Sequence, residues 1–288
     1  MNTAQTLLIP FEENLETVTF TTNFSQMFPL KIQNSIKGKI FETNIVSLQG
    51  YHTKNMNQSK QDINFINCDY KDLVLKMQAD GVLVDLILTD PPYGVSRVHQ
   101  LGFSNMGRAG MNYGDWDYNF DQKEWIKLTS PLVKDGGSVI IFNDWKNLSY
   151  LVEALTENGY IIKDLIRWEK SNPMPRNVNS RYVMDFEVAI WAVKGKKKWT
   201  FNKPTEVSYL RPMFRTGVLL GGNKRIHPTQ KSLEVFSELI KIHSNENDLI
   251  FDPFSGSGTT AVACKLLNRR FVGCEIDKNY YDKAIKRL

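Results

Sequence analysis

The stretch Val-Asp-Leu-Ile-Leu-Thr-Asp-Pro-Pro-Tyr at residues 84–93 decides the fold of this chain and the place of its chemistry. A short apolar run bounded by turn residues is typical of a strand buried in a parallel sheet. Two prolines then end the strand, because proline has no N–H group for a sheet ladder. They leave carbonyl acceptors between the carboxylate of Asp90 and the ring of Tyr93. This combination suits the exocyclic amino group of a nucleobase, although a plain strand exit would carry the same residues.

A second apolar run, residues 248–251, leads into the turn Asp-Pro-Phe-Ser-Gly-Ser-Gly-Thr-Thr at residues 252–260. The residues that follow predict a helix with Thr259 or Thr260 near its cap. A strand, a glycine-rich turn and a helix form the nucleotide-binding unit of doubly wound sheets. The next strand ends in Glu275, about 20 residues past the turn, where an acidic residue meets ribose hydroxyls. The turn lacks the lysine of an NTP-binding loop and the third glycine of a dinucleotide site, which favours an adenosine ligand without a pyrophosphate.

Strands and helices alternate from residue 63 onward, which predicts βαβ units around a mostly parallel sheet. Helices are predicted at residues 70–80, 124–133, 148–158 and 232–242. Two longer strands, at residues 160–168 and 182–193, are expected at an antiparallel edge. Residues 94–117 are rich in glycine and show no periodicity, so an active-site loop is expected there. Residues 1–60 are rich in asparagine, threonine and serine, and we interpret them as an N-terminal arm of unknown role.

Composition limits the class of protein. The chain has 288 residues, of which 42% are hydrophobic, enough to bury the core of one α/β domain with insertions. No apolar stretch reaches membrane-spanning length, and no secretion signal is recognised. The cysteines at positions 68, 264 and 274 lack zinc-ligand spacing and fit a reduced cytoplasmic protein, so no metal is expected.

Positive charge is concentrated in one segment. Residues 194–225 carry nine basic side chains and one acid, a net charge of +8 in a chain whose total is +5. The aromatic residues Trp199, Phe201, Tyr209 and Phe214 are interleaved with them. Positive charge suits phosphates and planar side chains suit bases, so residues 194–226 are predicted as a DNA target-recognition insertion. The alternative is a solvated basic loop. The predicted DNA-binding residues are Lys196, Lys197, Lys198, Arg211 and Arg215.

Together these motifs resemble the S-adenosylmethionine-dependent amino-methyltransferases of DNA. Their order, with Asp-Pro-Pro-Tyr before Phe-x-Gly-x-Gly, is similar to that of the β group, and the aspartate at position 90 resembles the N6-adenine type. Further segments match the family. They are Cys-Asp at residues 68–69, Trp-Glu-Lys-Ser-Asn-Pro-Met-Pro at residues 168–175, Arg181 with residues 187–191, and His-Pro-Thr-Gln-Lys at residues 227–231.

The resemblance implies a Rossmann-like class I methyltransferase fold, an α/β fold with one antiparallel edge strand and a circularly permuted motif order. It divides the chain into the arm, residues 1–60, and a catalytic domain, residues 61–288. It implies a site-specific adenine-N6 methyltransferase that takes a methyl group from S-adenosyl-L-methionine and acts on a flipped-out adenine in double-stranded DNA. The expected location is the cytoplasm of a bacterial or phage-infected cell. The expected partners besides DNA are a second copy of the chain and a cognate restriction endonuclease.

The resemblance also assigns roles to individual residues. Catalytic roles fall to Asp90, Pro91, Pro92 and Tyr93. Two acceptors, the Asp90 carboxylate and the Pro91 carbonyl, would hold the target amine while Tyr93 stacks on the base. Cofactor-binding roles fall to Asp69, Asp90, Thr229, Lys231, Asp252, Phe254, Ser255, Gly256, Ser257, Gly258, Thr259 and Glu275. In this set Glu275 would bind the ribose hydroxyls and Asp69 the adenine amino group of the cofactor.

Simpler roles and other reactions compete with these assignments. Asp69 could be only a strand-end cap, Lys231 could be a surface residue at a helix start, and Glu275 could be a plain strand-end acid. Cytosine-N4 methylation is the main alternative reaction, but many such enzymes carry serine where this chain has Asp90. A non-catalytic DNA-binding paralogue is opposed by the intact motifs. RNA and protein-glutamine methyltransferases more often have Asn-Pro-Pro-Tyr.

Overall fold

The computed structural model describes residues 62–93, 120–173, 175, 178–217 and 230–288, and the backbone of four short strands in the first 57 residues. The chain divides into two compact units, Met1–Asn57 and Gln58–Leu288. The first unit contains two antiparallel pairs, β1 (Gln5–Leu8) with β2 (Thr17–Phe20) and β3 (Ile32–Ile36) with β4 (Lys39–Thr43). The predicted loop at residues 94–117, the end of the predicted insertion and Thr229 lie outside the described residues.

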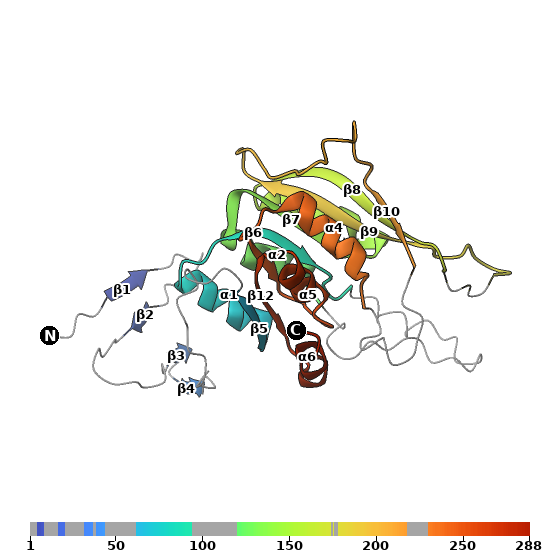
Figure 1. The fold of residues 1–288 in the computed structure, drawn as a ribbon. Helices are drawn as coiled ribbons and strands as arrows, with labels where there is room; N and C mark the ends of the chain where they lie inside the picture. Colours follow the sequence, from blue (N-terminus) through green and yellow to red (C-terminus); the bar gives the residue numbers. More distant parts are fainter. Residues whose placement is uncertain are drawn as a thin grey trace. The chain divides into compact units, whose positions relative to one another are not determined.

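The second unit is built around one eight-stranded sheet with helices on both of its faces (Figure 1). Its strands are β5 (Ile63–Asn67), β6 (Val84–Thr89), β7 (Val133–Asn143), β8 (Tyr160–Lys170), β9 (Phe186–Lys194), β10 (Met213–Thr216), β11 (Leu249–Asp252) and β12 (Arg270–Glu275). Its helices are α1 (Tyr70–Ala79), α2 (Gln122–Thr129), α3 (Leu148–Glu157), α4 (Leu233–His243), α5 (Thr259–Leu266) and α6 (Lys278–Ile285). Two 3-10 turns, η3 (Ser130–Leu132) and η4 (Trp145–Asn147), precede β7 and α3.

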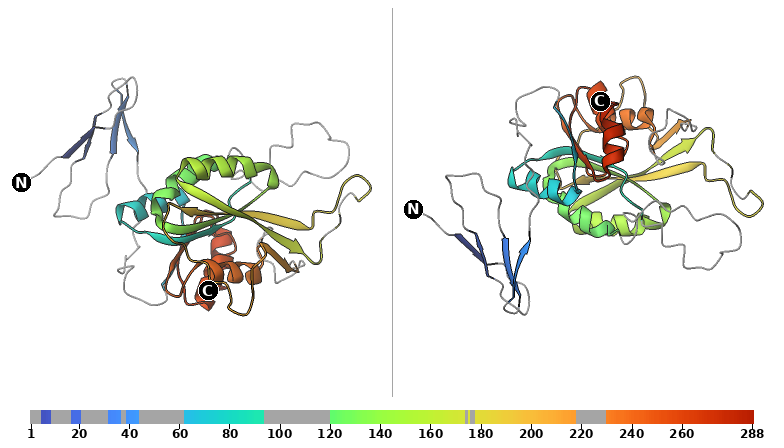
Figure 2. Two further views of the ribbon diagram at one scale, coloured as in Figure 1. Left: turned by 90° about the horizontal axis from the view of Figure 1, so that it is seen from above. Right: turned by 90° about the horizontal axis from the view of Figure 1, so that it is seen from below.

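Each face of the sheet is covered by three helices (Figure 2). Helices α1, α2 and α3 contribute Leu73, Trp125 and Leu151 to the core on one face. Helices α4, α5 and α6 contribute side chains such as Phe236 and Ala284 to the core on the other. Strand β6 is apolar on both sides because it lies between these layers. Among the described residues, no helix is long and apolar enough to cross a membrane.

The strand order is β10-β8-β9-β7-β6-β11-β12-β5. Strand β9 runs antiparallel to both of its neighbours, and every other pairing described in this sheet is parallel. The antiparallel strand therefore belongs to one end of the sheet, with β8 and β10 outside it. The predicted fold class, a mostly parallel α/β sheet of the Rossmann-like type, is confirmed.

The strand order has its switch point between β6 and β11. From β6 the chain passes through α2 on one face to reach β7, whereas from β11 it passes through α5 on the opposite face to reach β12. The two connections diverge, so the loops that leave the carboxyl ends of these adjacent strands part from each other. Ligands bind at such a switch point in open α/β sheets. Both sequence motifs begin here, at Asp90 after β6 and at Asp252, the last residue of β11.

Candidate active site

The Asp-Pro-Pro-Tyr motif is held by contacts from two neighbouring elements. The Pro92 carbonyl accepts a hydrogen bond from Gln122 Nε2 at the start of α2, over 2.6 Å. The Tyr93 carbonyl accepts one from Asn147 Nδ2 in η4, over 2.7 Å. Because prolines remove the N–H donors from this segment, side-chain donors to its carbonyls replace a sheet ladder in fixing its path.

Both carboxylate oxygens of Asp90 are engaged. Oδ2 lies 2.7 Å from the Lys231 ammonium, and Oδ1 accepts the Tyr93 hydroxyl over 2.5 Å. Lys231 Nζ is also 3.3 Å from the Tyr93 hydroxyl, so the three side chains form a closed triangle. The Lys231 side chain is only 8% exposed. Two catalytic candidates and one cofactor-binding candidate from the sequence thus meet at one point.

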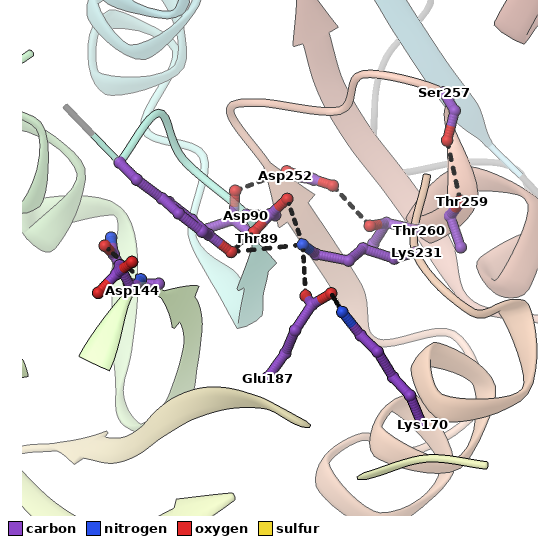
Figure 3. A network of polar contacts seen from close by, with 12 residues as sticks. Thr89, Asp90, Asp144, Lys170, Glu187, Lys231, Asp252, Ser257, Thr259 and Thr260 are labelled. Atoms are coloured by element: carbon purple, nitrogen blue, oxygen red, sulfur yellow. Dashed lines mark hydrogen bonds and ion pairs between the residues drawn. The ribbon is translucent and has the colours of Figure 1, made fainter. Parts of the chain in front are cut away.

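Two further charges extend this triangle into a chain of alternating sign (Figure 3). Lys231 Nζ lies 2.8 Å from Glu187 Oε2, and Lys170 Nζ lies 2.8 Å from Glu187 Oε1. The order is Asp90, Lys231, Glu187, Lys170, so the two inner charges, Lys231 and Glu187, each lie between charges of the opposite sign. Buried charges are tolerated in proteins when they are paired in this way.

The strand faces explain why these residues meet. Lys170 is two residues beyond Trp168 on β8, and Glu187 is two residues before Ala189 on β9. Alternation along a strand puts each on the face that α4 covers, since Trp168 and Ala189 belong to the core on that face. Lys231 immediately precedes the Ser232 cap of α4 and therefore arrives over the same face.

Burial and charge pairing shift the pKa values of these groups in opposite directions. Burial raises the pKa of Asp90 above its ordinary value, and Lys231 opposes that rise. Burial alone would raise the pKa of Glu187, but Lys231 and Lys170 together bring it down to about 2. Burial alone would lower the pKa of Lys231, but Asp90 and Glu187 raise it well above the usual range. Glu187 and Lys231 are therefore charged at neutral pH.

The glycine-rich turn is anchored through Asp252. Its Oδ1 accepts hydrogen bonds from the Thr89 hydroxyl over 2.7 Å and from the Phe254 amide over 3.1 Å, and its Oδ2 accepts the Thr260 hydroxyl over 2.5 Å. The carboxylate thus ties β6 to the first turn of α5, and burial raises its pKa to about 6. Asp252 was expected to bind the cofactor. Its position indicates that it shapes the turn.

The other residues of the turn divide between packing and backbone roles. Phe254 packs against Tyr70, Phe120 and Trp125, with ring centroids 4.9–5.6 Å apart. The side chains of Ser255, Ser257 and Thr259 form hydrogen bonds inside the protein. Gly258 has φ of 72° and caps α5, and a Cβ there would lie 3.2 Å from the Cβ of Ala284. Only glycine meets both conditions without strain.

Glu275 and Asp69 lie at the same edge of the sheet as the turn. Glu275 Oε2 accepts the Gly256 amide over 2.9 Å, and Oε1 accepts the Asp277 amide over 2.8 Å. Asp69 follows β5 and caps α1 by accepting the Lys71 amide over 2.8 Å. Asp69 is therefore a helix cap, and this contact occupies one of its two carboxylate oxygens.

The structure separates the predicted DNA-binding residues into two groups. Arg215 lies opposite Glu169 in the β10–β8 pair, near the carboxyl ends of the parallel strands, where Asp90 lies. Lys196 and Lys197 follow β9, which ends at the opposite edge, and both contact Asp135 at the start of β7. The backbone of Lys198 adjoins Gly136 there. The structure therefore brings Arg215, but not the three lysines, toward the catalytic edge, and Arg211 lies two residues before β10.

Three of the four aromatic residues of the insertion are engaged in packing. Trp199 lies beneath Lys163 Nζ, 3.5 Å from the ring centroid, and Phe201 stacks on Trp191 at 5.4 Å. Phe214 packs against the core beneath α4. Tyr209 is 66% exposed. Among these aromatic residues, it is the one most available to a partner.

Sequence reasoning placed Lys231 near the cofactor and did not assign a role to Glu187 or Lys170. Their mutual contact depends on the register of β8 with β9 and on where α4 begins, neither of which a local pattern reveals. The available signal was charge: Lys170 and Glu187 are ionisable residues at the ends of long strands and on the buried face.

Comparison with known proteins identifies the family. The family model described as DNA methylase matches residues 84–286. The Type II methyltransferase M2.DpnII of Streptococcus pneumoniae is 33% identical over 252 residues, 80% of this chain and 91% of that protein. The Type II methyltransferase M2.MboI of Moraxella bovis is 34% identical over 224 residues, 71% of this chain and 80% of that protein. The crystal structure of the M1.HpyAVI–SAM complex is 42% identical, covers 78% of this chain and 98% of its own, and has a TM-score of 0.65.

The match covers both motifs, the strands that carry them and the charge chain around Asp90. The predicted enzyme class and its cofactor, S-adenosylmethionine, are confirmed by the family. This chain belongs to the DNA methylase family.

Proposed function

We propose that this chain transfers a methyl group from S-adenosylmethionine to N6 of an adenine flipped out of double-stranded DNA. The observation that carries the proposal is the position of Asp90 at the switch point, beside the ring of Tyr93, in a DNA methylase. Relatives named Type II methyltransferases and a 42% identical protein solved with S-adenosylmethionine support it.

The pocket chemistry fits an amine that is a weak nucleophile. The lone pair of an exocyclic amino group is delocalised into its ring, so transfer requires acceptors that localise it. Asp90 accepts one N–H and the Pro91 carbonyl the other, because the Pro92 and Tyr93 carbonyls already accept Gln122 and Asn147. The same acceptors stabilise the positive charge that develops on nitrogen. The ring of Tyr93 stacks on the base, which must leave the duplex to arrive.

The acceptor set along the carboxyl edge fits the cofactor. Glu275 and Asp69 supply carboxylates at the ends of β12 and β5, and the oxygens that accept backbone amides there keep further lone pairs. These acceptors match the hydroxyl and amino groups of an adenosyl amino acid. Bound S-adenosylmethionine supplies the electrophilic methyl carbon. The protein contributes orientation, because its acceptors aim the amine from the adjacent strand.

Adenine is preferred to cytosine because position 90 is an aspartate. Both bases offer an exocyclic amine beside a ring nitrogen, so the acceptors alone do not choose between them. A carboxylate at this position, paired here with Lys231, is the residue that the resemblance associates with adenine.

DNA contact is assigned to the arginines near the catalytic edge. Arg211 and Arg215 are exposed, and Arg211 lies over the exposed Tyr209 ring, 5.9 Å from its centroid. Together they offer charge to phosphates and one planar surface. A second copy of the chain, a cognate endonuclease and a cytoplasmic location stay predictions of the resemblance. Light scattering of the purified chain tests the first.

The role of Asp90 is tested by separating transfer from cofactor binding. Asp90→Ala is expected to lower the transfer of labelled methyl to duplex DNA at least about a thousandfold, because an acceptor for the amine is lost. Its affinity for S-adenosylmethionine, measured by calorimetry, is expected to stay within about threefold of the unmodified chain. Parallel loss of binding and transfer would assign Asp90 to the cofactor site or to the fold.

A further inference from the structure

The Lys231 ammonium has a full set of partners. It lies 2.7 Å from Asp90 Oδ2, 2.8 Å from Glu187 Oε2 and 3.3 Å from the Tyr93 hydroxyl. A lysine ammonium carries three hydrogens, so each of them has an acceptor here. The cation is therefore shared between the catalytic carboxylate and a second carboxylate that has no place in the motif.

Glu187 is in turn shared between two cations. Its Oε2 meets Lys231, and its Oε1 meets Lys170 Nζ at 2.8 Å. Both carboxylate oxygens are thus committed, and the side chain is three-quarters buried. A stronger ion pair between Glu187 and Lys170 weakens the ion pair between Glu187 and Lys231, which leaves more of the Lys231 charge to Asp90. A weaker ion pair between Glu187 and Lys170 has the opposite effect.

The described charged and titratable groups around Asp90 come from three other elements. Lys231 precedes α4, Glu187 begins β9 and Asp252 ends β11, while Tyr93 belongs to the same strand exit as Asp90. Asp252 is held by Thr89 and Thr260. Among these groups, Glu187 is therefore the one that is also paired with a charge outside the group, that of Lys170.

We propose that Glu187 and Lys170 are positioning residues that set how strongly Asp90 accepts a hydrogen bond from the target amine, by dividing the charge of Lys231 between two carboxylates. The inference rests on the proposed methyl transfer for its catalytic meaning, but the charge division itself is a property of the chain. A carboxylate that shares its cation binds that cation less tightly and is a better acceptor for another N–H.

The two positioning residues have opposite effects on Asp90. Without the charge of Glu187, Lys231 belongs to Asp90 alone, so the carboxylate becomes more acidic and a weaker acceptor. Without the charge of Lys170, Glu187 takes a larger share of Lys231, so Asp90 becomes less acidic. A side chain that only supported the fold would not give paired shifts of opposite sign.

The test is the pH dependence of kcat in isosteric variants. Transfer requires ionised Asp90, so the acid limb of the profile follows its protonation. Glu187→Gln is expected to move this limb to lower pH and Lys170→Gln to higher pH, each by about 0.5. Lys123→Gln is the matched control, because Lys123 pairs with Glu153 on α3, outside the site, and is expected to leave the limb in place.

Shifts in the same direction, or no shift in either variant, would overturn the charge division. If Glu187→Gln does not fold, the upward shift of the acid limb in Lys170→Gln alone tests the charge division, because Lys170 is the last residue in the chain of charges. If the unmodified chain transfers no methyl group, the proposed function has failed. The charge division is then decided by the carboxyl-carbon NMR titration of Asp90, assigned with Asp90→Asn, in which the same opposite shifts are expected and their absence contradicts it.

Discussion

Asp90 has to exchange a hydrogen bond before it can hold a base. Its Oδ1 accepts the Tyr93 hydroxyl over 2.5 Å, the position that a target N–H would need. Burial and the neighbouring Asp90 charge raise the pKa of the Tyr93 hydroxyl well above its usual range, so it remains a donor at neutral pH. The side chain of Tyr93 therefore combines a ring that stacks on the base with a hydroxyl that competes with it.

Two substitutions separate the ring from the hydroxyl. Tyr93→Phe is expected to keep methyl transfer within about threefold of the unmodified chain, because the stacking surface stays and the competing donor is lost. Tyr93→Ala is expected to lower it by about 5- to 150-fold, because stacking contributes about 1–3 kcal/mol per base. Initial rates on one duplex substrate measure both. An equal loss in the two variants would show that the hydroxyl, and not the ring, is the required part.

At the scale of elements, the reversed direction of β9 decides which charges reach the site. The strand begins at the catalytic edge, where Glu187 is its second residue, and ends at the far edge with Lys194, so the lysines that follow it lie far from Asp90. Strand β10 then runs parallel to β8 and returns Arg215 toward the catalytic edge. One basic segment in the sequence thus becomes two separate basic groups.

DNA binding tests this separation. The double variant Arg211→Gln with Arg215→Gln is expected to reduce the slope of log affinity against log salt by about 2, since each lost phosphate contact removes about 0.9. The triple variant Lys196→Gln, Lys197→Gln and Lys198→Gln removes more charge and is expected to leave the slope almost unchanged. Fluorescence anisotropy at several salt concentrations measures both. A larger effect of the triple variant would place the duplex at the far edge.

The sequence predicted the elements whose pattern is local. The apolar runs ending at Asp90, Asp252 and Glu275 are strands, and the helix expected at residues 148–158 is α3. Strand β10 was not predicted, because its four residues, Met-Phe-Arg-Thr, lie in a basic segment and gain their strand form by pairing with β8. Pairing of distant segments also produced the contact of Glu187 with Lys231, which local patterns do not contain.

At the scale of the whole molecule, one buried histidine couples folding to pH. His243, at the end of α4, is 4% exposed and packs against Trp191 and Phe201, at ring distances of 4.5 and 5.7 Å. Among the described residues, its Nδ1 is a buried atom with no hydrogen-bond partner. Burial lowers its pKa to about 3. The folded chain therefore holds His243 neutral over a range in which the unfolded chain would protonate it.

The sign of the effect follows from proton uptake. Below about pH 6.5 His243 binds a proton in the unfolded state but not in the folded state, so the free energy of unfolding falls as the pH is lowered. From pH 7 to pH 5 this single group is expected to cost about 2 kcal/mol. His243→Phe keeps an aromatic ring in the cluster and removes the titration. Urea unfolding at the two pH values is expected to show a loss smaller by about that amount in the variant, and equal losses would contradict a neutral buried His243.

The complete arrangement orders the site along one edge of the sheet. The end of β5 carries Asp69, β12 carries Glu275, β11 carries the glycine-rich turn, and the exit of β6 carries Asp90 with Tyr93. Asp69, Glu275 and the glycine-rich turn therefore lie on one side of the switch point, and Asp90, which the target amine must reach, lies on the other. Methyl transfer between two ligands is the reaction that this order serves.

The most direct measurement is the identity of the methylated base. Duplex DNA is incubated with the purified chain and S-adenosylmethionine carrying a deuterated methyl group, then digested to nucleosides and analysed by mass spectrometry. The account predicts deuterated N6-methyladenine, formed by the unmodified chain and absent with Asp90→Ala. Label found only in N4-methylcytosine would contradict the assignment of adenine, and the absence of label from every nucleoside would contradict DNA methylation itself.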